Sequence, residues 1–445
     1  MRISLLPLFL FLTLSVYSQT LYFPPLTGNN WETESPSVLG WNADSLNALR
    51  TFLDANDTKA FIVLHNGRMV TEWYFDSFTA DSSWYWASAG KTLTALLAGI
   101  LQSKGFFSIN QKTSDFLGSG WTSLPAAKES LITIRNQLTM TTGLKDDVLD
   151  RDCTLPECLQ YTADAGNRWA YHNAPYTLLE KVMEQATGKT RNQLTQEYVK
   201  AKTGMTGLWF QQGYNNVFFS NARSAARFAL LIMNKGLWNV DTVLHDNIYF
   251  EEMVNTSQQL NKSYGYLWWL NGKESYMMPQ LQFVFNGSAI PTAPADLFAG
   301  LGKNDQKIYV IPSKGLCVIR FGNTTGTTPL ALSGFDNQLW ARIANLSQPS
   351  TIDEPSPPDN FELHQNYPNP FNPTTTIHFD IPQKSGVSLI VYNALGQQVQ
   401  ELVSDDMAPG TYSVDFDGAG LSSGLYFTVL RAGSVTLTRK MMLVK

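Results

Sequence analysis

A serine and a lysine stand three residues apart, at the point where a polar stretch passes into a long apolar run. Ser88 and Lys91 lie within residues 84–98, which read WYWASAGKTLTALLA. Positions i and i+3 of a helix share one face, so the Lys91 amine can reach the Ser88 hydroxyl. A desolvated lysine can remove the proton of a serine and so activate it as a nucleophile. Backbone N–H groups of a helix that begins at Ser88 would also stabilise an oxyanion. The spacing predicts a catalytic pair, with chance occurrence of the pattern as the alternative.

A second pair of polar side chains precedes a later helix. Tyr171 and Asn173 belong to a loop, and residues two apart in an extended segment point the same way. An ammonium group at Lys91 would favour the Tyr171 phenolate, which could then act as a general base. Asn173 can offer its amide to the substrate or to Lys91. The alternative is a packed aromatic ring followed by an asparagine helix cap.

Histidine chemistry has weaker support in this sequence. Of the five histidines, only His172 lies in a loop with candidate chemistry, and no acidic residue stands out as its partner. The literal Gly-x-Ser-x-Gly pattern at 420–424 lies between two expected strands, whereas a nucleophile elbow joins a strand to a helix. We interpret that pattern as a turn.

The elements that must position Ser88 follow from the hydrophobic periodicity. Two strands flank Asn66-Gly67, a strong hairpin signal, and a buried helix is expected from 88 to about 104. The remaining pattern predicts helices and then strands. The helices are expected at 131–138, 174–188, 191–201, 222–236 and 334–346, and the later strands at 281–285, 306–311 and 316–321. This order predicts an α+β domain, with an antiparallel sheet flanked by helices and a separate helical lobe.

The composition changes near residue 349. Residues 349–365 are rich in proline and predict a stiff linker. Beyond it, Ile377, Phe379 and Ile381 alternate with polar residues, and further short strands follow at turn-like spacing. Residues 366–445 are therefore expected to form a small β-sandwich.

Length, charge and the N-terminus limit the possible classes of protein. A chain of 445 residues with a net charge of −5 predicts several domains and gives no sign of nucleic-acid binding. Residues 1–18 combine a basic start, an apolar run and small residues before Gln19, as in a signal peptide. We expect residues 19–348 to form the first mature domain, with no transmembrane segment in the mature chain.

The cysteines are consistent with an exported protein. Cys153 and Cys158 are separated by four residues, which favours a local disulfide over a metal site because no further ligands lie nearby in sequence. Cys317 lies in an apolar strand-like run and is expected to be a buried free thiol.

Ser88-x-x-Lys91 followed by Tyr171-x-Asn173 resembles the serine β-lactamase and penicillin-recognising enzymes, specifically their class C and esterase-like branch. The stretches 131–144 and 166–171 strengthen the resemblance, which covers roughly residues 40–346. It implies an acyl-enzyme on Ser88, roles for Lys91, Tyr171 and Asn173, and no metal or cofactor.

The same resemblance implies a third motif on the strand beside the serine. A literal Lys202-Thr203-Gly204 is present, but it ends an expected helix and is interpreted as a C-cap. We assign the motif to Gly300 and Gly302, with the Lys303 N–H as a second oxyanion donor. The lysine or histidine that usually opens the motif is missing, which argues against β-lactam antibiotics and D-alanyl peptides. Lys303 is the candidate substitute.

The C-terminal region has its own resemblance. The run 366–374, NYPNPFNPT, together with 392–397, 423–427 and a basic end, resembles the C-terminal sorting domain of type IX secretion in Bacteroidetes-like bacteria. It implies contact with the secretion machinery and a secreted or outer-membrane-surface location. A carbohydrate-binding or adhesion sandwich is the alternative.

These patterns together predict an exported serine hydrolase that cleaves a small-molecule ester or amide, as in the esterase and 6-aminohexanoate-oligomer hydrolase branch. A β-lactamase or D-alanyl peptidase is the second possibility. A non-catalytic binding protein of the same fold is the third.

Overall fold

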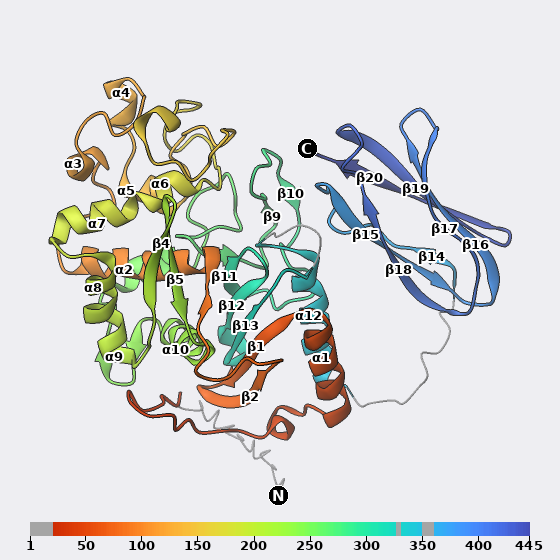
Figure 1. Ribbon diagram of the computed structural model, residues 1–445, viewed down its shortest axis with the longest axis horizontal. Coiled ribbons are helices and arrows are strands. Elements are labelled where there is room, and N and C mark those ends of the chain that lie inside the picture. The colour runs from red at the N-terminus through yellow and green to blue at the C-terminus, as the bar shows by residue number, and fades with distance from the viewer. Residues whose placement is uncertain (1–20, 326–330, 349–359) are drawn as a thin grey trace, which may run out of the picture.

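A six-stranded antiparallel sheet forms the centre of the first domain (Figure 1). The computed structural model describes residues 21–325, 331–348 and 360–445, so the expected signal peptide and most of the expected linker lie outside it. The strand order is β2-β1-β13-β12-β11-β8, and Ile62 of β1 pairs with Ile319 of β13. The strands are β1 (Thr58–His65), β2 (Arg68–Tyr74), β8 (Trp269–Leu270), β11 (Phe298–Gly302), β12 (Gln306–Ile311) and β13 (Leu316–Gly322). The predicted antiparallel sheet is confirmed.

Helices cover the sheet. Helices α1 (Ala43–Ala55) and α12 (Gly334–Ala344) lie side by side, and α10 (Ala222–Met233) packs against β1, β12 and β13. Helix α2 (Lys91–Ser103) is buried from Lys91 to Leu101, as its apolar residues on nearly all sides predict. The α-helix begins at Lys91, three residues later than expected. Ser88 belongs instead to a preceding 3₁₀ turn, η2 (Ala87–Gly90), in which Ala87 has a positive φ of 47°.

The predicted helical lobe is present beside the sheet (Figure 1). Its helical segments are α3 (Ser114–Leu117), α4 (Ala126–Glu129), α5 (Ile134–Leu138), η3 (Pro156–Cys158), α6 (Asn173–Thr177), α7 (Leu179–Thr187), α8 (Arg191–Thr195), η4 (Gln196–Lys200) and α9 (Ala201–Thr203). Helix α5 is shorter than expected because Thr133 caps it in a capping box with Asn136. Gly204 closes α9 with φ 68°, so the literal Lys202-Thr203-Gly204 is a helix C-cap.

The strand expected at 281–285 is largely wrong. Only β10 (Phe285–Asn286) forms, paired with β9 (Ser275–Tyr276), because Phe283 and Val284 are exposed and pair with no described strand. A small sheet, β3 (Trp84–Tyr85), β5 (Asn215–Ser220) and β4 (Leu208–Gln212), was not expected. Its strand β3 lies directly before the Ser88 turn in the chain, so the sheet helps to place that turn.

The C-terminal region forms two facing sheets, as predicted (Figure 1). One sheet has the order β14-β15-β18 and the other β17-β16-β19-β20. Ile377, Phe379 and Ile381 share the buried face of β15. The strands are β14 (Glu362–Leu363), β15 (Thr374–Ile381), β16 (Ser385–Asn393), β17 (Gln398–Met407), β18 (Gly410–Asp417), β19 (Gly424–Ala432) and β20 (Val435–Leu443).

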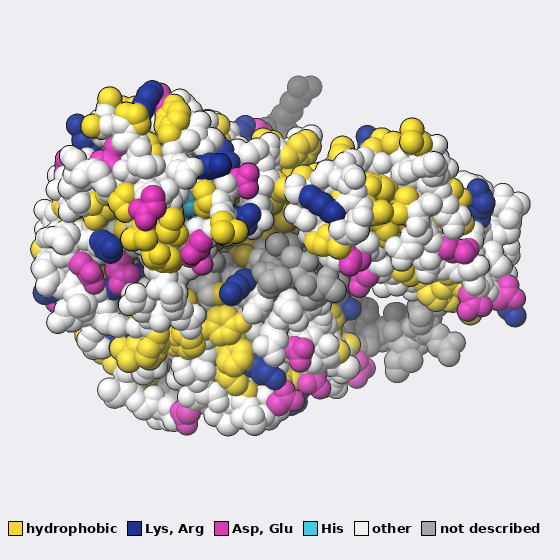
Figure 2. Space-filling model, turned by 45° about the horizontal axis from the view of Figure 1, so that its top comes forward, with side chains coloured by type: hydrophobic (Ala, Val, Ile, Leu, Met, Phe, Trp, Pro, Cys, Tyr) yellow, Lys and Arg dark blue, Asp and Glu magenta, His cyan; other side chains and the backbone are white. Residues whose placement is uncertain are grey.

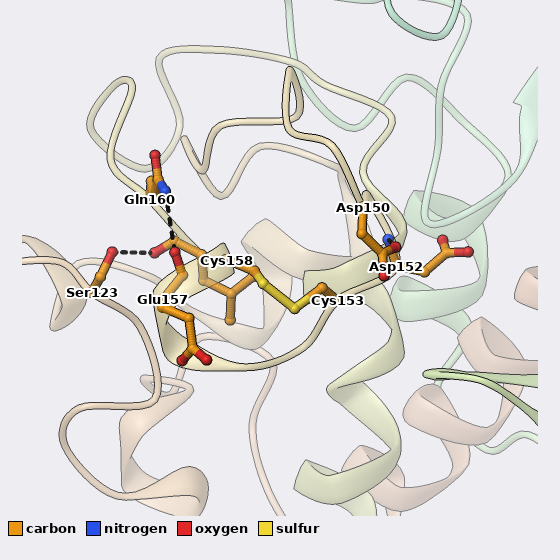
Figure 3. The surroundings of a disulfide bond; sticks show 8 residues. Ser123, Asp150, Asp152, Cys153, Glu157, Cys158 and Gln160 are labelled. Atoms are coloured by element: carbon orange, nitrogen blue, oxygen red, sulfur yellow. Dashed lines mark hydrogen bonds between the residues drawn. A yellow bond between two sulfur atoms is a disulfide. The ribbon is translucent and has the colours of Figure 1, made fainter.

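The surface shows no single concentration of charge on the face drawn in Figure 2, where basic and acidic side chains are interspersed. Within the described ranges, no helix combines the length and apolar character that crossing a membrane requires. A disulfide joins Cys153 to Cys158, with the Cα atoms 6.0 Å apart (Figure 3). Cys317 is buried in β13 as a free thiol.

Candidate active site

The Ser88 hydroxyl and the Lys91 amine are in direct contact. Lys91 Nζ donates a hydrogen bond to Ser88 Oγ at 3.0 Å, and the lysine is only 4% exposed. The turn that carries Ser88 is held by Trp86, whose backbone N–H donates to the Phe218 carbonyl and whose indole donates to Ser220 Oγ. The small sheet β3-β5-β4 therefore fixes the turn, and the first residue of α2 brings the amine to the hydroxyl.

The surroundings of Lys91 favour its neutral form. Burial lowers the pKa of Lys91 to about 7; the Asp152 carboxylate opposes this shift, and the Arg191 guanidinium adds to it. The Lys91 nitrogen lies 4.4 Å from the centre of the Tyr176 ring. Near neutral pH a large fraction of this amine has a free lone pair, so it can accept the Ser88 proton.

Tyr171 lies beside the same amine but differs from expectation in its protonation. Its ring centre is 5.1 Å from Lys91 Nζ and stacks on Trp269 at 5.9 Å. Burial raises the pKa of Tyr171, outweighing the hydrogen bond to Ser88, which lowers it. The expected phenolate is therefore not favoured, because desolvation by burial outweighs the hydrogen bond to Ser88. Tyr171 is suited to donate or relay a proton, while Lys91 is the better base.

Asn173 is the first residue of α6, and its amide is bound to a residue that the sequence reasoning missed. Asn173 Nδ2 donates to Asp152 Oδ1 at 2.8 Å. Asp152 directly precedes Cys153, and that position next to a predicted disulfide was the available signal. His172 is buried, and burial lowers its pKa to about 4, so the imidazole is neutral at pH 7. It is not among the residues that line the cavity at Ser88.

Gly300 and Gly302 place β11 directly against the serine turn. A Cβ atom at Gly302 would lie 2.6 Å from the Trp86 carbonyl oxygen and 3.1 Å from the Ala89 nitrogen. A Cβ atom at Gly300 would lie 3.1 Å from the Thr92 side chain. Only glycine allows so close an approach of strand and turn. Lys303 follows at the end of this strand and borders the cavity.

A cavity of about 450 Å³ unites most of these side chains. Of the predicted residues, Ser88, Lys91, Asn173 and Lys303 line it, whereas Tyr171, Gly300 and Gly302 are not among its lining residues. The other residues of the wall were not predicted, and most are aromatic or carry side-chain amides: Tyr85, Ala87, Asp152, Tyr176, Gln212, Asn215, Asn216, Val217, Phe219 and Asn304. Several come from the β4-β5 hairpin, whose position depends on tertiary packing.

Potential metal ligands gather away from this cavity. Across the described ranges, one grouping of three has donor atoms within 4.8 Å of one another, formed by Glu362, His364 and Asp380 in the C-terminal domain. His364 Nε2 is already hydrogen-bonded to Asp380 Oδ2 at 2.7 Å. Glu362 lies in β14 and Asp380 in β15, and His364 directly follows β14.

Comparison with known proteins identifies both regions. A family model described as Beta-lactamase matches residues 55–339, and one described as Secretion system C-terminal sorting domain matches residues 365–445. An uncharacterized protein of Alkalihalophilus pseudofirmus is 21% identical over 321 residues, covering 63% of this chain and 89% of that protein.

Solved structures share the fold at low sequence identity. A candidate 6-aminohexanoate-dimer hydrolase from Bacillus anthracis has a TM-score of 0.53 and 18% identity, covering 72% of this chain and 86% of that one. A penicillin-binding protein homologue from Caulobacter crescentus has a TM-score of 0.52 and 13% identity, covering 68% and 98%. A class C beta-lactamase from Rhodobacter sphaeroides has a TM-score of 0.50 and 15% identity, covering 68% and 98%.

Proposed function

The chain belongs to the beta-lactamase family, and from that premise we propose that it is an exported serine hydrolase that cleaves an ester or amide through an acyl-enzyme on Ser88. The observation that carries the proposal is the 3.0 Å contact between Lys91 Nζ and Ser88 Oγ, made by an amine whose pKa is lowered to about 7. A serine beside a largely neutral amine is an activated nucleophile.

The proposed reaction has two halves. Ser88 Oγ attacks the carbonyl carbon as its proton passes to Lys91, and the N–H groups of Ser88 and Lys303 hold the oxyanion. The bond to the leaving group then breaks, and the leaving group takes a proton relayed from Lys91 through Tyr171. In the second half, water attacks the acyl-enzyme, its proton returns through the same groups, and Ser88 is regenerated. Side chains and water suffice for these steps, so we propose no cofactor.

The cavity favours a small ester or amide as the substrate. Its wall is rich in neutral amides, with Lys303 as the cation at the end of β11. The third motif, Gly300-Leu301-Gly302, lacks the cation that resembling enzymes place at its first position. A candidate 6-aminohexanoate-dimer hydrolase among the structural neighbours supports small amides as a substrate class. A β-lactamase or D-alanyl peptidase is the second candidate, supported by the family and by neighbours with those names.

The sorting domain supports export by type IX secretion to the medium or the cell surface. We propose that residues 1–18 act as a signal peptide, that residues 19–348 carry the hydrolase, and that residues 366–445 engage the secretion machinery after the linker at 349–365. Whether the last domain is removed can be read from the mass of the secreted chain.

Substrate hydrolysis tests the proposal. Purified protein is assayed with a chromogenic short-chain ester, a chromogenic anilide and a chromogenic cephalosporin, each compared with the Ser88→Ala variant. The proposal expects Ser88-dependent cleavage of the ester or anilide at a higher kcat/KM than of the cephalosporin. Preference for the cephalosporin would favour the second candidate. Absence of Ser88-dependent turnover on all three would favour a binding protein of the same fold.

A further inference from the structure

Asp152 reaches the cavity from the position directly before a loop that a disulfide closes. It is followed at once by Cys153, which is bonded to Cys158, and its own N–H donates to Asp150 Oδ1 at 3.0 Å. Figure 3 shows the Asp152 side chain pointing away from the sulfur bridge. The carboxylate lines the same cavity as Ser88 and Lys91. The loop therefore delivers a negative charge to the proposed site.

The carboxylate decides how the Asn173 amide is oriented. A carboxylate oxygen accepts hydrogen bonds, so the NH₂ group of Asn173 must face Asp152, as the 2.8 Å contact between Nδ2 and Oδ1 shows. The amide oxygen then faces away from Asp152. It is buried and has no hydrogen-bond partner among the described residues. Asp152 therefore leaves Asn173 with a buried amide oxygen that can still accept a hydrogen bond.

The charges around Lys91 come from several elements. Arg191 of α8 is 2% exposed, and its guanidinium donates to the Tyr176 hydroxyl at 2.9 Å, on the ring that Lys91 overlies. Tyr171 lies over the same amine, and Lys303 borders the cavity from β11. Glu180 of α7 forms an ion pair with Arg191 at 3.7 Å. At the Lys91 amine itself, Asp152 supplies the negative charge.

Burial lowers the pKa of Lys91, the Asp152 charge raises it, and the Arg191 charge lowers it. Loss of the carboxylate would therefore move the titration of the amine to lower pH. Loss of a distant exposed carboxylate would leave the titration of Lys91 unchanged, because salt in the solvent screens charges beyond about 10 Å.

We propose that Asp152 is a positioning residue of this site, which fixes the orientation of the Asn173 amide and balances the charge of Arg191 at Lys91. The inference rests on the proposed function for its catalytic consequence. The disulfide has a defined part in it, because it anchors the residue next to Asp152.

The pH dependence of kcat/KM for the chromogenic ester tests the proposal, since this profile reports groups of the free enzyme. We expect the lower inflection, near pH 7 in the wild type, to move down by about 0.5–1 unit in Asp152→Asn and Asp152→Leu. It stays in place in Asp152→Glu, which keeps the charge. Asp147→Asn is the matched control, because Asp147 is an exposed carboxylate of the same loop.

A second readout does not depend on turnover. The unfolded chain holds the Lys91 proton up to about pH 10.5, whereas the folded protein loses it near pH 7, so the unfolding temperature contains a contribution that rises with pH across this window. Asp152→Asn moves the start of that rise to lower pH.

The proposal is overturned if Asp152→Asn has the same kcat/KM inflection and the same pH dependence of the unfolding temperature as the wild type. It is also overturned if Asp147→Asn shifts these two readouts as much as Asp152→Asn does. A wild type without turnover would refute the proposed function alone, because the thermal readout would still decide the place of Asp152.

Discussion

Lys91 Nζ lies 3.0 Å from Ser88 Oγ although the two residues belong to different helical elements. Ser88 is in the 3₁₀ turn η2 and Lys91 is the first residue of α2. The tight turn keeps the i, i+3 contact that an uninterrupted helix would also give. Because α2 is buried from its first residue, the amine is held in a desolvated position that favours its neutral form.

The desolvation of Lys91 predicts that removing its amine raises the free energy of unfolding and lowers the activity. Lys91→Met keeps a similar volume but removes a buried amine whose pKa is lowered to about 7. Below pH 7 the folded wild type must hold that charge, so we expect the variant to gain about 2–4 kcal/mol in free energy of unfolding at pH 6, and less at pH 9. Turnover should fall by about 10³-fold or more. Urea unfolding and ester assays at both pH values measure these effects.

The matched control is Lys303→Met, because Lys303 is an exposed lysine beside the same cavity. It should leave the free energy of unfolding nearly unchanged. Activity in Lys91→Met would contradict the assigned role of the amine. A gain in free energy of unfolding that is smaller at pH 6 than at pH 9 would contradict its assigned protonation state.

The hydroxyl of Tyr171 is predicted to matter for proton transfer more than for folding. Tyr171→Phe keeps the ring that stacks on Trp269, so the unfolding temperature should change little. The rate should fall by about 10²-fold or more, because the relay between Lys91 and the leaving group is lost. Tyr161→Phe is the control: Tyr161 is exposed and its hydroxyl donates to Asp164 at 2.8 Å. Equal rates in the two variants would remove Tyr171 from the mechanism.

The close approach of β11 to the serine turn predicts that Gly302 tolerates no side chain. In Gly302→Ala the new Cβ would lie 2.6 Å from the Trp86 carbonyl oxygen, so the strand or the turn must move. We expect kcat to fall by about 10-fold or more, through a displaced oxyanion site, with a loss of about 1–3 kcal/mol in stability. Gly334→Ala serves as the control, since its Cβ would meet nothing closer than 3.9 Å. Normal kcat in Gly302→Ala would show that β11 does not form the oxyanion site.

The disulfide is predicted to support activity as well as stability. Reduction, or the double variant Cys153→Ser with Cys158→Ser, frees the residue next to Asp152. We expect a loss of about 2 kcal/mol in free energy of unfolding and a partial loss of kcat/KM. Dithiothreitol should impair the wild type and leave the double variant unaffected, which separates this bridge from the buried thiol of Cys317. Full activity after verified reduction of the Cys153–Cys158 disulfide would contradict the role of the loop.

The sequence supports prediction where chemistry depends on local spacing. Ser88 and Lys91 are three residues apart in the chain, and the glycines of β11 directly precede a recognisable strand, so both could be proposed without coordinates. Tyr176 could not, and Asp152 had only its position next to Cys153 as a signal, because the place of both residues beside Lys91 depends on how the helical lobe packs against α2. The protonation of Tyr171 was also out of reach, since it depends on burial by Trp269 and neighbouring rings.

The fold shows the same division. Strongly periodic segments such as β1, β12 and α10 are confirmed, because their apolar residues face a single core. The strand expected at 281–285 failed, since an apolar run forms a strand only where a partner offers its backbone groups.

Covalent labelling of Ser88 tests the central claim most directly. The wild type and Ser88→Ala are treated with a fluorophosphonate probe, and the labelled peptide is mapped by mass spectrometry. The account predicts one label per chain, on the peptide that contains Ser88, at a rate that rises with pH through about 7 as Lys91 loses its proton, and none on Ser88→Ala. A wild type that stays unlabelled at Ser88 across pH 6–9 would contradict it.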